Sequence, residues 1–389
     1  MRIVMLSDVY FPRVNGVSTS IETFRRCLAA LGAHVQLVAP AYDDAPAGSA
    51  ADIIRLPSRR IPFDPEDRLM SWRAALALTP ELARDKPDLI HIQTPFVAHH
   101  AGVALARRLR IPAVATYHTL FEEYLHHYIP FLPRTWLQGL ARHHSRRQCE
   151  ALEGVVVPSV AMAERLRQYG VQAPLEILPT GIPTAHFAQG DRARFRAQHG
   201  LAPARPVALY VGRVAHEKNI GFLLHALQHA RQRLPELCLV ITGEGPARPD
   251  LERQARTLGL CDNVRFLGYL DRRQALPDAY AGADLFVFAS RTETQGLVLL
   301  EAMAAGLPVL ALAVMGTRDI LAPERGCRIG PEEPGAFGAA MAELLATPER
   351  LQSLARAAQE YATCWSDSAM AERLLAFYTR IQSAWLSPR

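Results

Sequence analysis

The sequence lacks several features that would indicate other classes of protein. No apolar run approaches the roughly 20 residues that a membrane-spanning helix needs. A signal peptide is not expected either, because Asp8 directly follows the short stretch from Arg2 to Ser7. The six cysteines are scattered and form no CxxC pair, so neither a zinc site nor a disulfide framework is indicated. We therefore expect reduced thiols, no metal and a cytoplasmic location.

Concentrated positive charge is also missing. The net charge is only +5, and no single basic stripe of the kind typical of nucleic-acid-binding proteins stands out. We expect no nucleic-acid partner, although this excess is enough for weak attraction to an anionic substrate or surface. A GxGxxG motif after the first predicted strand of either half is absent as well, which argues against a dinucleotide-binding domain.

Short apolar runs alternate with longer amphipathic stretches along all 389 residues. At roughly 100–200 residues per domain, this length suggests two domains. The alternation predicts parallel sheets with helices on both faces, in other words doubly wound, Rossmann-like α/β domains. The predicted strands are Arg2–Ser7, His34–Ala39, Asp88–Gln93, Ala113–Tyr117, Val155–Pro158, Leu175–Pro179, Val207–Gly212, Leu237–Thr242, Asn263–Gly268, Asp284–Ala289, Pro308–Leu312 and Cys327–Ile329.

The domain boundary is predicted near residue 185, because prolines and glycines cluster in a polar stretch from Pro183 to Pro206. The first domain then comprises residues 1–185 and the second residues 186–365. Ser366–Leu386 is predicted to be a single terminal helix within residues 366–389, since its apolar residues recur at helical spacing. Open α/β sheets bind ligands at the carboxyl ends of their strands, so two facing sheets would form a cleft for ligands.

The segment between Glu293 and Glu301 gives the strongest functional signal. Glu293 follows a predicted strand, and Glu301 lies about one and a half turns inside the next helix, roughly 8–12 Å away. Two carboxylates at this separation suit the hydroxyls of an extended ligand. The N–H groups of Thr294, Gln295 and Gly296 would point at an anion between them. The alternative is an ordinary helix start with a surface glutamate.

Two further loops of the second domain follow predicted strands. Gly212 precedes Arg213 and Lys218, whose positive charges could converge on a diphosphate. Gly243 opens a Gly-Glu-Gly turn after the next strand and would allow close approach of a ligand. A solvated basic loop and a simple turn remain the respective alternatives.

The first domain offers two candidate positions of its own. Gly16 lies in a loop after the first strand, where its N–H could face a phosphate. His118 follows the fourth strand, in the layer that would touch a sugar or acceptor. A plain strand–helix turn and a structural histidine are the alternatives.

The segment from residue 121 to 147 combines aromatic and arginine residues. Tyr124, Tyr128 and Trp136 could anchor it at a lipid surface, while Arg142 and Arg146 attract anionic headgroups. A core helix with solvated arginines would give the same composition, so both interpretations stay open.

Together these residues resemble the group 1 glycosyltransferases of family 4, which have the GT-B fold. The resemblance covers essentially the whole chain, and its most specific marker is the Glu-x7-Glu motif formed by Glu293 and Glu301. It implies that Glu293 contacts the donor sugar and Glu301 the nucleotide ribose. It also implies that Arg213 and Lys218 neutralise the diphosphate of the donor.

The resemblance extends to the first domain and to the reaction. Gly16 matches the family's glycine-rich loop and His118 its sugar-proximal histidine. The first domain would bind the acceptor, the second the nucleotide sugar, and the terminal helix would return to the first domain. One departure is visible: Gln295-Gly296 stands where many members have Phe-Gly. The implied reaction retains the anomeric configuration, by front-side attack, without metal or cofactor.

The acceptor is indicated by the stretch from Tyr117 to Tyr124, which is similar to bacterial diacylglycerol glycosyltransferases. This favours glucosyl transfer from UDP-glucose to a lipid at the inner face of the plasma membrane, with an anionic membrane surface as partner. The runner-up is mannosyl or other hexosyl transfer to a polysaccharide or lipid-linked sugar. A UDP-sugar 2-epimerase shares the architecture, and a non-enzymatic membrane- or polyanion-binding protein is the third alternative.

Overall fold

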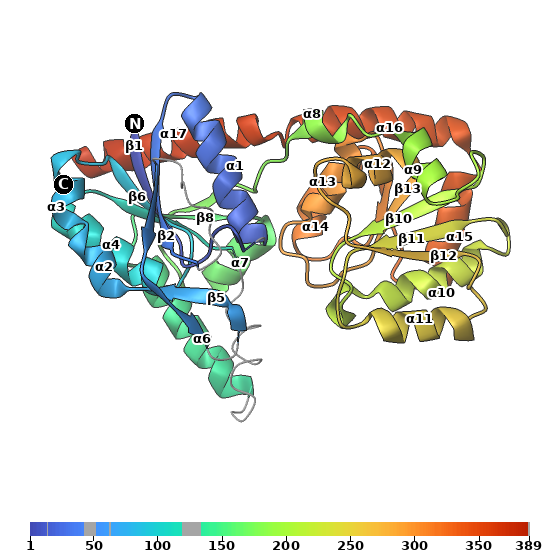
Figure 1. Ribbon diagram of the computed structural model, residues 1–389, viewed down its shortest axis with the longest axis horizontal. Coiled ribbons are helices and arrows are strands. Elements are labelled where there is room, and N and C mark those ends of the chain that lie inside the picture. The colour runs from blue at the N-terminus through green and yellow to red at the C-terminus, as the bar shows by residue number, and fades with distance from the viewer. Residues whose placement is uncertain (14, 43–51, 62–63, 119–133, 388–389) are drawn as a thin grey trace. The chain divides into compact units, whose positions relative to one another are not determined.

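A computed structural model describes residues 1–13, 15–42, 52–61, 64–118 and 134–387 (Figure 1). The chain divides into two compact units. The first comprises residues 1–181 together with 367–389, and the second comprises residues 182–366. Both contain a parallel sheet, which confirms the predicted α/β class.

The first unit is built on a seven-stranded parallel sheet of order β3-β2-β1-β6-β7-β8-β9. The strands are nearly all apolar because helices cover both faces of the sheet. Helices α1 and α17 pack together on one face, and α2 and α3 pack against α4 on the other. The sheet strands are β1 (Arg2–Leu6), β2 (His34–Pro40), β3 (Ile53–Leu56), β6 (Leu89–Ile92), β7 (Ala113–Thr116), β8 (Gly154–Val157) and β9 (Leu175–Ile177).

Three helices of the first unit, α1, α2 and α7, begin at side-chain caps formed by Asn15, Ser71 and Ser159. Helix α1 starts at Gly16, which the sequence analysis places in the loop before it, because Asn15 and Ser18 form a reciprocal capping box. The helices are α1 (Gly16–Ala30), α2 (Trp72–Ala77), α3 (Thr79–Arg84), α4 (Val97–Leu109), α6 (Arg134–Cys149), α7 (Val160–Gln168) and α17 (Asp367–Leu386).

Strand β3 and the antiparallel pair β4 (Ser58–Ile61) and β5 (Asp64–Met70) are absent from the sequence prediction. They lie at the edge of the unit, where β3 pairs only with β2 and has partly exposed side chains. The sequences of such strands show only a weak apolar pattern, because other elements cover only one face of the strand.

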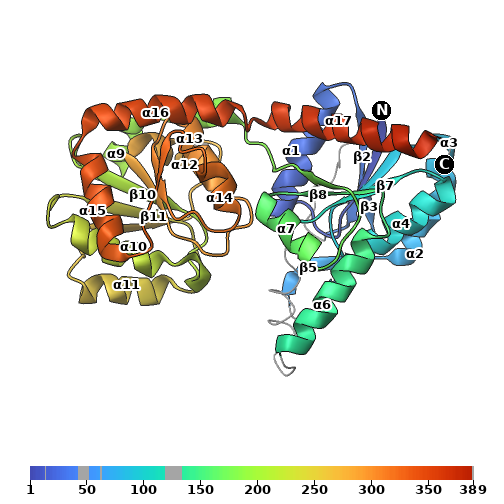
Figure 2. The ribbon, with the colours of Figure 1, turned by 180° about the vertical axis from the view of Figure 1, so that it is seen from behind.

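The last helix of the chain, α17, packs on the first unit beside α1 (Figure 2). Its residues Met370, Leu374, Phe377 and Ile381 are buried in the core of that unit. The ring of Phe377 lies so close to Gly154 of β8 that a Cβ at Gly154 would meet it at 2.7 Å. A side chain larger than hydrogen at Gly154 would therefore force the Phe377 ring to shift.

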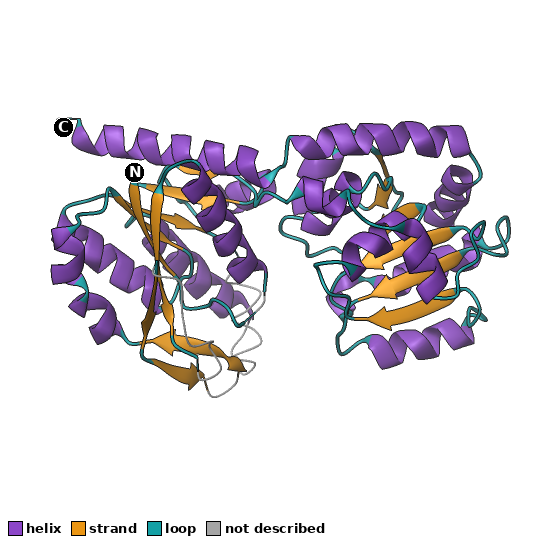
Figure 3. Ribbon diagram, turned by 45° about the horizontal axis from the view of Figure 1, so that its top comes forward, coloured by secondary structure: helices purple, strands orange, loops and turns teal. Residues whose placement is uncertain are grey.

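The second unit has a six-stranded parallel sheet of order β12-β11-β10-β13-β14-β15 (Figure 3). Its core stacks Tyr210, Phe286 and Phe288 along one face of the sheet. The strands are β10 (Val207–Val211), β11 (Cys238–Thr242), β12 (Val264–Gly268), β13 (Leu285–Phe288), β14 (Val309–Ala311) and β15 (Cys327–Ile329). The helices are α8 (Thr184–Phe187), α9 (Arg192–Gln198), the 3-10 turn η1 (His216–Lys218), α10 (Ile220–Ala230), α11 (Arg248–Thr257), α12 (Ala275–Gly282), α13 (Leu297–Ala304), α14 (Gly316–Leu321), α15 (Pro334–Leu345) and α16 (Pro348–Thr363).

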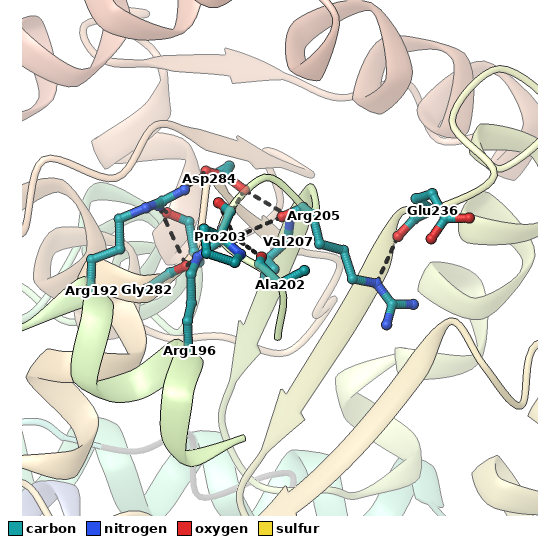
Figure 4. A network of polar contacts seen from close by, with 10 residues as sticks. Arg192, Arg196, Ala202, Pro203, Arg205, Val207, Glu236, Gly282 and Asp284 are labelled. Carbon is teal, nitrogen blue, oxygen red and sulfur yellow. Dashed lines mark hydrogen bonds and ion pairs between the residues drawn. The ribbon is translucent and has the colours of Figure 1, made fainter. Parts of the chain in front are cut away.

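A buried arginine fastens helix α9 to the amino ends of strands β10 and β13 (Figure 4). The guanidinium of Arg196 donates to the carbonyls of Gly282 and Ala202, each at 2.9 Å, and to the Asp284 carboxylate at 2.9 Å. Asp284 also accepts the Val207 amide at 2.8 Å. Because each of its three nitrogens donates to an acceptor and a carboxylate balances the charge, the guanidinium is tolerated inside the unit.

No helix in the described part of the chain is both long and apolar enough to cross a membrane.

Candidate functional site

The candidate donor residues gather at the carboxyl ends of three neighbouring strands in the second unit. Strand β10 lies between β11 and β13, so the loops that follow these strands share one edge of the sheet. Gly212 follows β10, Gly243 follows β11, and Glu293 follows β13. The topology therefore brings together three segments that are widely separated in the sequence.

The two glycine loops are bonded backbone to backbone. The Val214 amide donates to the Glu244 carbonyl at 2.9 Å, and the Ala247 amide donates to the Val214 carbonyl at 3.0 Å. Gly243 has φ +120°, and a Cβ there would lie 1.9 Å from the Gly212 carbonyl oxygen. Both the positive φ and the close approach require glycine. The turn that the sequence predicts at Gly243 is thus tight, and it has no side chain at this position.

Lys218 and Glu293 form an ion pair across two of these loops. The Lys218 Nζ donates to the Glu293 Oε2 at 2.9 Å, and both side chains are mostly covered. Asn219, with φ +55°, follows Lys218 and donates from its side chain to the Ala289 carbonyl at 3.2 Å. This contact fixes the end of η1 against the end of β13. Two residues that the sequence analysis assigned to one ligand therefore lie in direct contact.

The loop from Glu293 to Gly296 is held by the start of α14. The Gly316 amide donates to the Glu293 carbonyl at 3.0 Å, and a Cβ on Gly316 would lie 2.0 Å from the Thr294 carbonyl oxygen. Gln295 and then Gly296, with φ +82°, lead into α13, whose N-terminus is capped by no side chain. The backbone N–H groups there are suited to an anion, as the sequence predicted for this loop.

The Arg213 side chain is the most open of the predicted donor residues, at 67% exposure. Its guanidinium lies 3.8 Å from the Glu217 carboxylate, one turn along the same loop. The backbone of Arg213 is fixed, because the Tyr210 hydroxyl donates to its carbonyl at 3.1 Å. The loop is therefore anchored while the cation at its surface can reach a ligand.

Glu301 lies deeper than the sequence analysis assumed. It is 1% exposed, and the Tyr280 hydroxyl donates to its Oε2 at 2.9 Å. Arg272 donates to the other carboxylate oxygen. Burial, reinforced by Glu301, raises the pKa of Tyr280 well above its ordinary value. Both oxygens of the carboxylate expected to contact a ribose are thus engaged by protein side chains.

Arg272 and Tyr280 are therefore residues of this region that sequence reasoning missed. Arg272 also stacks over the Phe187 ring, with its guanidinium carbon 5.6 Å from the ring centroid. Neither residue lies in a recognisable motif. The available signal was the largely apolar sequence of α12, which suggests that Tyr280 is buried but does not name its partner.

In the first unit, Gly16 and His118 follow different strands, and Gly16 belongs to helix α1 instead of the loop that the sequence predicts. Gly16 is the exposed first residue of α1, and a Cβ there would have no neighbour within 4 Å among the described residues. The structure thus shows no steric need for glycine at this position. The loop before it contains Asp8, a buried residue whose Oδ2 accepts from Thr94 Oγ1 at 2.8 Å and from the Ala98 amide at 3.0 Å.

His118 lies just beyond the end of β7 and is half-buried. Its Nε2 is 3.0 Å from the Oε1 of Gln93, which follows the neighbouring strand β6. Burial lowers the pKa of His118 to about 4. The imidazole is therefore neutral at physiological pH and can form hydrogen bonds but carries no charge.

The predicted lipid-binding residues are only partly described. Tyr124 and Tyr128 lie outside the described residues, as does the side chain of Trp136. Arg142 is exposed, with its guanidinium carbon 5.7 Å from the centroid of the Tyr169 ring. Arg146, also exposed, lies beside Gly170. Both arginines are exposed and lie next to the residues that follow α7, Tyr169 and Gly170, an arrangement compatible with headgroup binding and with simple solvation.

In the described part of the chain, no group of three or more His, Cys, Asp or Glu side chains is arranged to hold a metal ion.

Comparisons with known proteins agree on one family. The model of glycosyl transferases group 1 matches residues 191–361, and that of glycosyltransferase family 4 matches residues 14–186. An alpha-monoglucosyldiacylglycerol synthase of Streptococcus pneumoniae is 32% identical over 358 residues, or 90% of this chain and 79% of the relative. A GDP-mannose-dependent alpha-mannosyltransferase of Mycobacterium tuberculosis is 28% identical over 84% of this chain and 82% of its own.

The fold has solved counterparts as well. A sucrose-phosphate synthase from Thermosynechococcus elongatus superimposes with a TM-score of 0.76 and covers 98% of this chain and 99% of its own. At 24% identity, this likeness concerns the fold alone.

Proposed function

Because the chain belongs to the group 1 glycosyltransferases of family 4 and is therefore a glycosyltransferase, we propose that it transfers glucose from UDP-glucose to a diacylglycerol-type lipid. The structural observation that supports the proposal is the ion pair between Lys218 and Glu293. It places a cation for a diphosphate and a carboxylate for sugar hydroxyls in contact, beside an uncapped helix N-terminus. The similarity to a monoglucosyldiacylglycerol synthase supports the choice of donor and acceptor.

The proposed chemistry depends on charge that grows on the leaving diphosphate. Lys218 Nζ and the Arg213 guanidinium stabilise that charge as the glycosidic bond breaks, together with the backbone N–H groups at the start of α13. Glu293 accepts hydrogen bonds from hydroxyls of the transferred sugar. The acceptor hydroxyl attacks from the face that the diphosphate leaves, so the anomeric configuration is retained. No residue of the chain forms a covalent intermediate in this proposal.

The first unit would present the lipid acceptor. Its candidate contact to the sugar is His118, and the outer arginines of α6, Arg142 and Arg146, would rest against an anionic membrane surface. The enzyme would then bind peripherally to the inner face of the plasma membrane. Replacing both arginines by glutamine should weaken sedimentation with anionic vesicles and leave UDP binding unchanged. Unchanged sedimentation would favour the alternative of a helix that only packs.

The donor and acceptor are tested by product analysis. Purified enzyme is incubated with UDP-glucose or GDP-mannose and with vesicles containing diacylglycerol and phosphatidylglycerol. The expected product is a monoglucosyl lipid whose anomeric proton coupling shows retention. Turnover with GDP-mannose alone would instead support mannosyl transfer, for which the Mycobacterium tuberculosis relative is the specific argument. Isomerised UDP-sugar without any acceptor would favour the 2-epimerase reaction and overturn the proposal.

The donor site is tested by a matched pair of acid variants. Glu293→Gln should lower kcat on the order of 100-fold, because a neutral amide loses the ion pair with Lys218 and accepts only weaker, uncharged hydrogen bonds from sugar hydroxyls. Glu217→Gln is the control, since Glu217 lies on the same loop as Lys218 but is exposed and 3.8 Å from Arg213. It should stay within about threefold of the wild type. Equal effects of the two variants would remove Glu293 from the site.

A further inference from the structure

Two side-chain contacts link β6 to β7 in the first unit, one between residues of the strands and one between residues just beyond their ends. His91 Nε2 lies 2.7 Å from Thr116 Oγ1, and Gln93 Oε1 lies 3.0 Å from His118 Nε2. The second contact is displaced from the first by two residues on each strand, which keeps it on the same face of the sheet. The neighbouring strands therefore carry a short ladder of polar pairs that ends at His118.

We propose that Gln93 is a positioning residue that holds His118 in the tautomer protonated on Nε2, so that its unprotonated Nδ1 accepts a hydrogen bond from a hydroxyl of the bound sugar. The inference rests on the proposed function, because it adds an orientation to a histidine already assigned to the sugar.

The chemistry of the pair determines which ring nitrogen carries the proton. An amide oxygen only accepts hydrogen bonds, so the nitrogen that faces Gln93 Oε1 must donate. The imidazole is neutral, since burial lowers its pKa to about 4, and a neutral ring has one donor and one acceptor. Nδ1 is then the acceptor. Within the part of the chain that the structure describes, Nδ1 has no hydrogen-bond partner, which leaves it available to substrate.

The other contact of the ladder involves a histidine, His91, whose two ring nitrogens are both engaged by the protein. His91 uses both ring nitrogens, because its Nδ1 lies 2.5 Å from the Tyr378 hydroxyl of α17. Burial lowers the pKa of His91 to about 3, so this titratable neighbour of His118 is neutral as well. His91 is thus fully satisfied inside the protein, whereas His118 keeps one polar atom free of described partners.

The position of Gln93 also favours a positioning role over a surface contact. Gln93 is 3% exposed, and it follows β6 directly, so its amide cannot swing into solvent. A buried amide that bonds to one atom of a half-buried histidine restricts the rotation of that ring. Preorganised hydrogen bonds of this kind lower the cost of reaching the productive geometry.

The inference is tested by two substitutions that differ only in the acceptor. Gln93→Leu removes the acceptor and should lower kcat about tenfold, the worth of one hydrogen bond, while UDP affinity stays within about twofold. Gln93→Glu keeps an oxygen acceptor and should recover most of that loss at pH 8.5. Its carboxylate favours the protonated imidazole, so activity should then decline as the pH falls toward the raised pKa of His118.

A matched control separates positioning from general damage. Thr116→Val removes the neighbouring contact of the ladder, which does not touch His118, and should change kcat by less than about threefold. Equal losses in Thr116→Val and Gln93→Leu would overturn the inference. The ring itself is observed by 15N NMR of histidine-labelled protein, with the His118 signals assigned by their loss in His118→Asn.

The spectrum distinguishes failure of the inference from failure of the proposed function. Wild-type His118 should show a protonated Nε2 and a bare Nδ1, and Gln93→Leu should shift the ring toward a mixture of tautomers. A wild type protonated on Nδ1 overturns the inference even if glucosyl transfer is observed. Full activity of His118→Asn would overturn it too, and would leave the transferase proposal standing. Absence of transfer from UDP-glucose in the wild type refutes the proposed function, while the spectra still test the role of Gln93.

Discussion

At the scale of single residues, Asp8 is a buried carboxylate of the first unit whose surroundings disfavour the charged form. It is 3% exposed, and its Oδ1 has no hydrogen-bond partner among the described residues. Burial raises its pKa from 3.8 to about 6, although Ala98 and Thr94 bond to its other oxygen. Below about pH 6 the folded protein therefore holds Asp8 as the neutral acid. At neutral pH Asp8 is ionised in the fold, and this buried charge lowers the free energy of unfolding.

Asp8→Asn should consequently stabilise the protein in a pH-dependent way. A raised folded-state pKa means that stability is fully present below pH 3.8 and is lost as the pH rises through about 6. The loss amounts to about 3 kcal/mol for roughly two pKa units. The variant should match the wild type near pH 4 and exceed it in thermal melts above pH 7. A stability difference that does not change with pH would contradict this assignment.

Arg213 illustrates a residue that matters for chemistry and not for folding. Its guanidinium is mostly exposed, and its one described charged contact is at 3.8 Å. Arg213→Ala should leave the free energy of unfolding within about 0.5 kcal/mol of the wild type. It should lower kcat more than it weakens UDP-glucose binding, because the charge it faces grows in the transition state. Melting curves and steady-state kinetics check the two halves, and an unchanged kcat would mean that the diphosphate lies elsewhere.

These residues also show what the sequence could and could not indicate about the site. Lys218 and Glu293 were both assigned from loops that follow strands, and the strand order explains why they meet. The engagement of Glu301 by Arg272 and Tyr280 could not be read, because three separate elements contribute and no motif links them. Gln93 was likewise hidden, since its importance lies in a neighbour 25 residues away.

At the scale of elements, α9 provides a controlled comparison of buried and exposed ion pairs. Arg196 and Arg192 both bond to Asp284, yet the Arg196 side chain is 4% exposed and that of Arg192 is 46% exposed. Arg196→Met should destabilise the protein by about 3–5 kcal/mol, because the carboxylate and several carbonyls lose their buried partner. Arg192→Met should cost less than about 1 kcal/mol.

Chemical denaturation of the two variants tests this predicted difference in the free energy of unfolding. The unfolding midpoint should fall strongly for Arg196→Met and barely for Arg192→Met. Similar small effects would mean that α9 is not fastened by its buried arginine. The contrast is informative because the acid, the helix and the substituted residue type are the same in both variants.

Elements were more predictable than residues, for a physical reason. Every strand predicted from an apolar run appears in one of the two large sheets, because strands covered on both faces must be apolar throughout. The edge strand β3 and the pair β4–β5 escaped prediction, since partial exposure permits polar residues such as Arg55. The start of α1 shifted to Gly16 because the capping box depends on Asn15, which precedes the amphipathic stretch.

At the scale of the whole molecule, the chain begins and ends in the same unit. Helix α17 buries Phe377 and Tyr378 in the first unit, and Tyr378 bonds to His91 at 2.5 Å. The helix also bonds to the surface of that unit, since Arg380 pairs with Glu176 and Gln382 with Asp88. The terminal segment is thus part of the core of the first unit and not an appendage. The sequence pattern predicts the helix, but only the resemblance to a family indicated where it packs.

This arrangement predicts that the two units respond to different perturbations. Phe377→Ala should destabilise the first unit by about 3–5 kcal/mol, because it removes a 4% exposed ring that contacts Gly154. UDP should stabilise the second unit, which holds the proposed donor loops, in proportion to the logarithm of its concentration over Kd. Calorimetry of the intact chain should therefore show one transition lowered by the substitution and another raised by UDP. If UDP raised the transition that Phe377→Ala lowers and left the other unmoved, the donor would bind the first unit. A single transition that moves with both would show instead that the units unfold together.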